Sequence, residues 1–246
     1  MNNQLDSLKE VLLMGPGPSC VPPAVYAALS KPTIGHLDPQ FIAIMDEIKA
    51  LLQRVMQTRN RLTLPISGTG SAGMETCFVN LVEPGDEVVV CVNGVFGTRM
   101  ADIVNRIGGK LVRVDAEWGT AIDPRALQDA IAGRKPKVVA VVHAETSTGV
   151  CQPLEDLARI SHDAGALFLV DTVTSLGGMP VAIDDMNIDA VYSGTQKCIS
   201  GPPGLSPVSF SRTAVRAMEQ RKTPYKMSTI TTFSGQYLMV AIFVKS

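Results

Sequence analysis

A lysine, an aspartate and a glycine-rich turn carry the chemistry that this sequence most clearly suggests. Lys197 stands in the segment YSGTQK, and Asp171 ends the apolar run LFLVD. The third feature, residues 67–73 (SGTGSAG), follows an apolar run and precedes a helical pattern. Glycines at such a turn let backbone N–H groups approach an anion at the helix N-terminus. The sequence thus offers an amine, an acid and a phosphate site.

Each of these features taken alone also has a structural explanation. The glycine-rich turn matches G-x-G-x-x-G, but the next apolar run ends in CVN, and its acids, Asp86 and Glu87, stand at its beginning. Dinucleotide binding requires an acid at the far end of that strand, so it is disfavoured. The turn could also be a tight strand-to-helix connection, Asp171 a helix N-cap, and Lys197 an ordinary surface lysine.

The combination is more specific than its parts, because it is the set that pyridoxal phosphate needs. That cofactor requires an anion cradle, a lysine to bond its aldehyde carbon, and an acid to keep its ring nitrogen protonated. We expect Asp171 to pair with the ring nitrogen. We expect Lys197, once released by substrate, to move the proton between the substrate Cα and the cofactor carbon. No metal site is expected.

Short apolar runs alternate with helical patterns through the middle of the chain, which predicts an α/β fold. Because the runs are apolar at nearly every position, we expect a mostly parallel sheet with helices on both faces and ligands at the carboxyl ends of the strands. The predicted strands are 62–66, 87–92, 110–114, 138–143, 166–170 and 190–193. The predicted helices are 74–81, 97–107, 124–132 and 154–163, the third beginning with an N-cap and proline at Asp123-Pro124.

Composition excludes several other classes of protein. The net charge is −1 with no basic stripe, so nucleic acid is not an expected partner. No signal peptide or membrane-spanning run is apparent, and the five cysteines form no C-x-x-C pair. We therefore expect a cytoplasmic protein that does not associate with membranes, and we expect most of its cysteines to be packing residues.

An ordered series of segments resembles the class V aminotransferases of fold type I, specifically the alanine–glyoxylate and serine–pyruvate (serine–glyoxylate) aminotransferases. The resemblance runs from about Leu12 to Pro224. It rests on LLMGPGPSCVPP, QTRNRLTLPISGTGSAGMET, VNGVFGTR, HAETSTGV, LVDTVTSLGG and YSGTQKCISGPPG. The function implied is transfer of an amino group from alanine or serine to glyoxylate or pyruvate, with a small amino acid and a 2-oxo acid as substrates.

The resemblance also implies roles for matching positions. Lys197 would form the Schiff base and Asp171 would hold the ring nitrogen. Phe96, where many relatives carry tryptophan, and Val173 would flank the cofactor ring, while Thr146 would bond its ring oxygen. The phosphate would be held by Thr69, Gly70, Ser71 and Gln196, and Gly17 would approach the substrate. Phe96 and Val173 could instead be core residues, and His143 is expected to be structural rather than a catalytic base.

Relatives of this kind are longer, and their C-terminal domain supplies an arginine for the substrate carboxylate. We expect residues 1–224 to form the cofactor-binding domain, residues 225–246 to form an atypical tail, and the small C-terminal domain to be absent. The family also implies a homodimer. One alternative is therefore a catalytically impaired fragment that folds and binds the cofactor or a partner chain. Another is a lyase such as a cysteine desulfurase, for which Cys198 is poorly placed.

Overall fold

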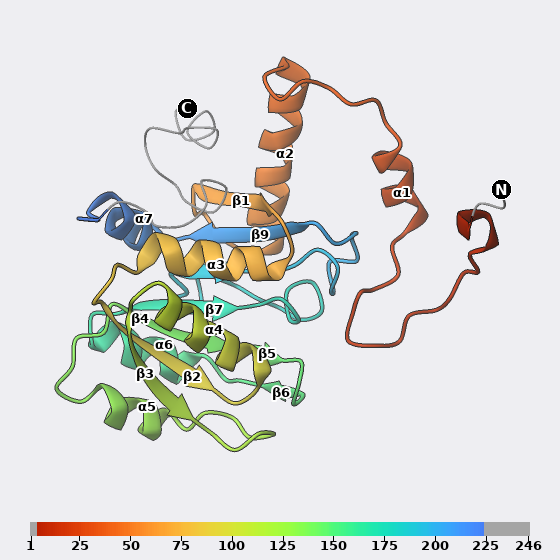
Figure 1. Cartoon of the computed structure of the whole chain (residues 1–246). Coiled ribbons are helices and arrows are strands. Elements are labelled where there is room, and N and C mark those ends of the chain that lie inside the picture. Colours follow the sequence, from red (N-terminus) through yellow and green to blue (C-terminus); the bar gives the residue numbers. More distant parts are fainter. Residues whose placement is uncertain (1–3, 224–246) are drawn as a thin grey trace.

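A computed structural model describes residues 4–223, and within this range seven strands form one sheet in the order β1-β9-β8-β7-β4-β2-β3 (Figure 1). β9 runs antiparallel to both of its neighbours, whereas the other paired strands are parallel. The strands are β1 Leu62–Ser67, β2 Glu87–Val92, β3 Lys110–Asp115, β4 Val138–Val142, β7 Leu167–Asp171, β8 Ala190–Tyr192 and β9 Leu205–Phe210. This confirms the predicted mostly parallel sheet.

Successive side chains of the central strands pack into two separate cores. In β2, Val88 and Val90 face one core while Val89 and Cys91 face the other. β4 and β7 alternate in the same way, and all their residues are buried. Such strands need apolar residues at both parities, because each side chain is removed from water on one face or the other. Continuous apolar runs in the sequence therefore correspond to strands covered on both faces.

Helices cover both faces of the sheet, as predicted (Figure 1). One core contains side chains of α3 Gly70–Leu81, α4 Val95–Arg106 and α7 Arg212–Glu219. The other contains side chains of α5 Pro124–Ile131 and α6 Glu155–Asp163. The predicted N-cap of α5 is present, since the Asp123 carboxylate accepts a hydrogen bond from Arg125 N at 2.9 Å and Pro124 occupies the first turn.

Several elements were not predicted from the sequence. β9 contains Pro207, whose missing N–H disfavours a place inside a strand. The structure places Pro207 directly opposite Pro65 of β1, so the two residues without a donor share one register position. The helices α2 Pro39–Val55 and α7 were also missed, although Asp38 and Ser211 each provide an N-cap hydrogen bond. The small hairpin of β5 Ala144–Glu145 and β6 Val150–Cys151 was not expected either.

The N-terminal part of the chain forms an arm outside the sheet domain. The 3-10 helix η1 Gln4–Ser7 and helix α1 Pro23–Leu29 contain no buried residue, and Figure 1 shows both on an arm that stands away from the sheet. Among the described residues, no helix combines the length and the apolar character needed to cross a membrane. The predicted tail at residues 225–246 lies outside the described residues.

Gly73 shows how closely α3 packs against the sheet, and it allows a test of that packing. A Cβ at this position would overlap Ser206 Oγ and lie 3.0 Å from the Cβ of Tyr192. Alanine is favoured over glycine inside a helix by about 1 kcal/mol, but overpacking a core costs about 1–3 kcal/mol. Because Ser206 is buried and donates to Ser193 O, it has little room to move.

We therefore expect Gly73→Ala to lower the free energy of unfolding by about 1 kcal/mol or more, measured by urea denaturation. Gly35→Ala is the matched control, because a Cβ at Gly35 would meet no atom within 4 Å. The control should be neutral or slightly stabilising. Equal stabilisation by both substitutions would contradict the close packing of α3.

Candidate active site

The residues predicted to carry the chemistry meet at the edge of the sheet where the parallel strands end. Asp171 is the last residue of β7, and Lys197 lies on the turn that follows β8. The glycine-rich turn connects β1 to α3, and it is tied to the same edge by the hydrogen bond from Gly68 N to Gly204 O at 2.7 Å. Parallel strands place their carboxyl ends side by side, and this explains the convergence.

Lys197 is partly buried and is covered by the N-terminal segment. Its Nζ donates to Pro16 O at 2.6 Å, and Ser19 Oγ donates to the carbonyl of Lys197 at 2.8 Å. Gly17 lies against the lysine so closely that a Cβ there would be 2.6 Å from Lys197 Cδ. Gly17 also has a φ of +119°, which favours glycine. The structure thus brings Gly17 into contact with Lys197, while its approach to the substrate stays a prediction.

Asp171 is a buried carboxylate with two hydrogen-bond donors. Its Oδ1 accepts from Val173 N at 2.8 Å, and its Oδ2 accepts from Tyr192 OH at 2.7 Å. Burial, together with the nearby Glu145 charge, raises the pKa of Asp171 from about 3.8 to about 6. The two donors and Lys197 act in the opposite direction on the pKa. Asp171 therefore accepts from the turn that follows it and presents a carboxylate at the site. In the described chain no helix directly follows Asp171, so the alternative of a helix N-cap is wrong.

The N-terminus of α3 has the properties of an anion cradle. Thr69 is its N-cap but makes no side-chain cap hydrogen bond, so the first backbone N–H groups of α3 have no acceptor from the cap. Gly70 packs against Val173, since a Cβ at Gly70 would lie 2.8 Å from Val173 Cγ2. Ser71 Oγ accepts from Arg99 Nη1 at 3.3 Å, which brings a positive charge to this turn. Both the helix end and the arginine favour a bound anion.

The side chain of Gln196 supports a ligand beside this cradle. Its Oε1 is buried and has no hydrogen-bond partner among the described residues. A Cβ on Gly194 would lie 2.9 Å from this oxygen and 3.5 Å from Gly70 N, so the amide borders the start of α3. An unpartnered buried amide is costly unless a ligand or water completes it. A phosphate offers no donor to this oxygen, so Gln196 would hold a phosphate through its NH2 group, with the amide turned over. With that orientation, Thr69, Gly70, Ser71 and Gln196 fit a phosphate group.

Phe96 and Thr146 come from two neighbouring strand ends. Phe96 is in the first turn of α4, is partly buried, and has the guanidinium of Arg99 5.8 Å from its ring centre. The Thr146 hydroxyl lies 2.6 Å from the hydroxyl of Thr174, which is in the turn that follows Asp171. The structure brings both to the same edge as Asp171. Helix α4 was predicted to start at Gly97, and its earlier start places Phe96 inside the helix.

Sequence reasoning missed Glu145, Tyr192 and Arg99. Tyr192 and Glu145 are buried and lie near Asp171, whose pKa both influence. Tyr192 was seen as part of a strand, and its partner Asp171 is 21 residues away. Arg99 follows Phe96 by three residues, a helical spacing that places the two side chains on one face. That spacing is the one signal in the sequence that could have indicated a role for Arg99.

Other reactive side chains at this edge have structural partners. His143 is 4% exposed, its Nδ1 lies 3.0 Å from Ser175 Oγ, and burial lowers its pKa. This agrees with a structural role for His143. Cys198 Sγ donates to Thr174 O at 3.2 Å. Among residues 4–223, no group of three or more His, Cys, Asp or Glu side chains is arranged to hold a metal ion.

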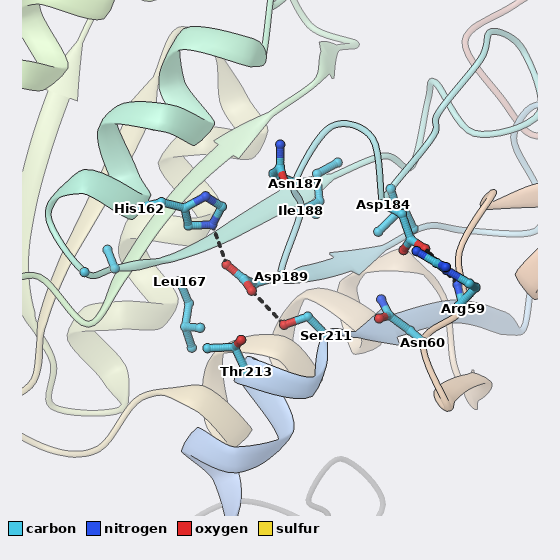
Figure 2. A pocket seen from close by; sticks show the side chains of 13 residues that line it. Arg59, Asn60, His162, Leu167, Asp184, Asn187, Ile188, Asp189, Ser211 and Thr213 are labelled. Atoms are coloured by element: carbon cyan, nitrogen blue, oxygen red, sulfur yellow. Dashed lines mark hydrogen bonds and ion pairs between the residues drawn. The ribbon is translucent and has the colours of Figure 1, made fainter.

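A separate pocket lies at the opposite edge of the sheet, near the start of β7. Figure 2 shows Asp189 at its centre, accepting from Ser211 Oγ at 2.6 Å and lying 2.8 Å from His162 Nε2. Phe168 N donates to the same carboxylate at 3.0 Å. None of the described residues that line this pocket has an unpartnered buried side-chain atom. We interpret this network as structural, because it joins α6, β7 and α7.

Comparisons with known proteins place the chain among aminotransferases. A family model for class-V aminotransferases matches residues 11–239. The chain is 44% identical over 217 residues to alanine–glyoxylate aminotransferase of Rattus norvegicus, covering 88% of this chain and 52% of the rat protein. It is 40% identical over 210 residues to (S)-ureidoglycine–glyoxylate transaminase of Bacillus subtilis, covering 85% and 50%.

A solved structure gives the same result for the fold. The crystal structure of alanine–glyoxylate aminotransferase from Nostoc sp. matches with a TM-score of 0.85 and 43% identity, covering 92% of this chain and 62% of that chain. The predicted fold of type I pyridoxal-phosphate enzymes is therefore confirmed. The chain spans about half the length of the curated relatives it matches.

The raised pKa of Asp171 predicts a pH-dependent effect of Asp171→Asn on stability without cofactor. The unfolded carboxyl ionises near 3.8 and the folded one near 6, so the folded protein bears a charge-burial cost that develops between these pH values and persists above them. A difference of about 2 pKa units corresponds to about 3 kcal/mol.

We compare the free energy of unfolding of Asp171→Asn with that of wild type by urea denaturation at pH 4 and at pH 8. The difference should shift in favour of the variant by up to about 3 kcal/mol from pH 4 to pH 8, because only wild type bears the cost of the buried charge. Comparing the two pH values removes any constant effect of the substitution on packing. Asp129→Asn, which removes an exposed carboxylate, is the control and should show little change. A gain that is the same at pH 4 and pH 8 would contradict the assignment.

Proposed function

Since the chain belongs to the class-V aminotransferase family, we propose that it forms the cofactor-binding part of a pyridoxal-phosphate-dependent aminotransferase. The amino group would move from alanine or serine to glyoxylate or pyruvate. The observation that carries this proposal is the convergence of the Lys197 amine, the Asp171 carboxylate and the open N-terminus of α3 at one edge of the sheet. The names of the relatives support glyoxylate as an acceptor.

The described residues offer a place for each part of the cofactor. Thr69, Gly70, Ser71 and Gln196 would hold the phosphate, which suits the unfilled N-terminus of α3. Gln196 would donate through its amide NH2 group, turned toward the phosphate. Phe96 and Val173 would flank the ring, and Thr146 would bond the ring oxygen. Asp171 would hold the ring nitrogen in its protonated form, because opposite charges attract strongly where water is excluded.

When bound, pyridoxal phosphate withdraws electrons from the substrate Cα and so makes its proton acidic. Lys197 would take that proton. Its Nζ donates to Pro16 O at 2.6 Å, and this hydrogen bond holds the side chain at the carboxyl edge of the sheet. The absence of a side chain at Gly17 leaves the lysine room to move between substrate and cofactor. The same amine would deliver the proton to the cofactor carbon. Water would then release the 2-oxo acid, and the amino group left on the cofactor would pass to the acceptor in the reverse sequence.

The N-terminal segment and the cysteines support the expected homodimer and compartment. The segment before Pro16 carries exposed apolar side chains: Leu8 is 75%, Val11 65%, Leu12 76% and Met14 84% exposed. Exposed apolar side chains of this kind are typical of an interface, and a homodimer would cover them. All five cysteines are free, which supports a reducing compartment such as the cytoplasm.

Lys197→Ala tests the proposed chemistry. With the purified protein and pyridoxal phosphate, we expect wild type to show the visible absorption of lysine-bound cofactor and the variant to lose it. Transfer from alanine to glyoxylate, or from serine to pyruvate, should fall by at least about 1,000-fold, because both covalent attachment and proton transfer are lost. Lys110→Ala, at an exposed strand position, is the control.

An unchanged absorption band in Lys197→Ala would refute the assignment of this lysine. Wild type that binds cofactor but transfers no amino group from either donor would instead favour a catalytically impaired fragment. The lyase alternative predicts release of sulfur from cysteine, which the same preparation can be tested for. The hydrogen bond of Cys198 to Thr174 O makes that outcome unexpected.

The homodimer is tested by sedimentation velocity. We expect wild type to sediment as a dimer. The double variant Leu8→Ser, Leu12→Ser should have a dimer dissociation constant at least about tenfold higher, because two exposed apolar side chains are removed from the proposed interface. Trp118→Ser, which removes an exposed aromatic side chain outside the arm, is the control. A wild-type monomer, or a double variant as dimeric as wild type, would contradict the proposal.

A further inference from the structure

Helix α4 begins without a cap of its own, and two residues from another strand end replace it. Its N-cap residue is Gly94, which has no side chain to accept a hydrogen bond. The N–H of Val95 donates to Ser147 Oγ at 3.0 Å, and the N–H of Phe96 donates to Glu145 Oε2 at 3.1 Å. Gly97 N also points to Glu145 Oε2, at 3.4 Å. The first turn of α4 is thus held by residues about 50 positions away.

Glu145 is at the centre of this arrangement. The residue is 1% exposed, and its Oε1 accepts from Ser147 N at 3.1 Å and from Ser147 Oγ at 2.6 Å. With the two α4 donors, its carboxylate accepts four hydrogen bonds. A buried carboxylate requires such compensation, and the positive end of a helix adds to it. Gly94 is needed for space here, since a Cβ there would lie 2.5 Å from Glu145 Cδ.

This carboxylate connects two residues proposed to touch the cofactor ring. Phe96 follows directly from the α4 N-terminus that Glu145 holds, and Thr146 is the next residue after Glu145 itself. Glu145 also influences Asp171 electrostatically, so it lies close to the third ring contact. Movement of Glu145 would therefore displace the stacking ring and the hydroxyl together.

The same carboxylate distinguishes the two helix N-termini at this edge. Those of α3 and α4 both follow strands of the sheet, and both are attractive to anions. At α4 the donors are already occupied by Glu145 and Ser147. At α3 the N-cap makes no side-chain hydrogen bond. A phosphate would therefore find one open helix end and one that is filled by a negative charge.

We propose that Glu145 is a positioning residue that sets the placement of Phe96 and Thr146 around the cofactor and reserves the N-terminus of α3 for the phosphate. The proposal rests on the proposed function, because it concerns the same cofactor. Glu145 itself need not touch the cofactor, and it acts through the first turn of α4 and the turn at residues 145–148.

Glu145→Gln tests this role with little change of shape. The amide keeps one accepting oxygen, but its NH2 group would face N–H donors that the carboxylate now accepts. We expect the dissociation constant of pyridoxal phosphate to rise by about tenfold or more, as for loss of hydrogen bonds to a charged group. The visible circular dichroism of bound cofactor should also weaken, because the ring that stacks on it is no longer fixed.

Glu83→Gln is the matched control. Glu83 Oε1 also accepts two backbone N–H bonds and a hydroxyl bond, from Lys222 and Thr223, but at a different part of the chain. We expect both variants to lower Tm, but only Glu145→Gln to change cofactor affinity and dichroism. Adding Glu145→Gln to Phe96→Ala should weaken binding less than adding it to wild type, because the residue acts partly through Phe96.

Several results would overturn the inference. Unchanged cofactor affinity and dichroism in Glu145→Gln, with Tm lowered as in the control, would show a purely structural role. If the effects of Glu145→Gln and Phe96→Ala on cofactor affinity add fully in the double variant, Glu145 does not act through Phe96, and the proposal is contradicted. If Glu145→Gln does not fold, Ser147→Ala provides the test. We expect this variant to raise the dissociation constant of pyridoxal phosphate by about threefold or more, and an unchanged constant would contradict the proposal. Wild type that binds no pyridoxal phosphate would refute the proposed function instead.

Discussion

The structure depends on a sheet whose central strands are buried on both faces. In β2, β4 and β7 nearly every side chain enters one of two apolar cores, so charged groups have almost no place along the strands. Polar side chains can gather only where the strands end and the chain turns. Asp171, Glu145 and the turn of Lys197 all occupy such positions. The site is thus a consequence of the same burial that makes the sheet stable.

Asp171 shows how the fold accommodates a charge at the end of a buried strand. Two donors, Val173 N and Tyr192 OH, compensate the carboxylate, and Tyr192 itself lies in the apolar core. Burial nevertheless prevails, which is why the pKa is raised to about 6. A cationic ring nitrogen would supply the missing counter-charge. We therefore view the carboxylate as a group that is costly in the empty protein and favourable once the cofactor is bound.

Two helix ends at one edge are treated differently by the fold. The glycine-rich entrance to α3 leaves backbone donors facing the site, with Gln196 and Arg99 nearby. The entrance to α4 is filled by a glutamate from a neighbouring strand end. Both turns are glycine-rich in sequence, so their backbones alone would not distinguish them. The distinction comes from the side chains that lie against each helix end. As a result, an anion finds free donors at α3 and a carboxylate at α4.

The sequence by itself determined the parallel sheet, six of its seven strands, the helices α3 to α6, and the grouping of Lys197, Asp171 and the glycine-rich turn. These follow from local patterns, because continuous apolar runs, proline and glycine act within a few residues. The resemblance to aminotransferases was equally readable. Only the tertiary structure decided that β9 with Pro207 is a strand, that Gly17 lies on Lys197, and that Glu145 caps α4. Each of these depends on contacts between residues far apart in the chain, and local propensity carries no record of such partners.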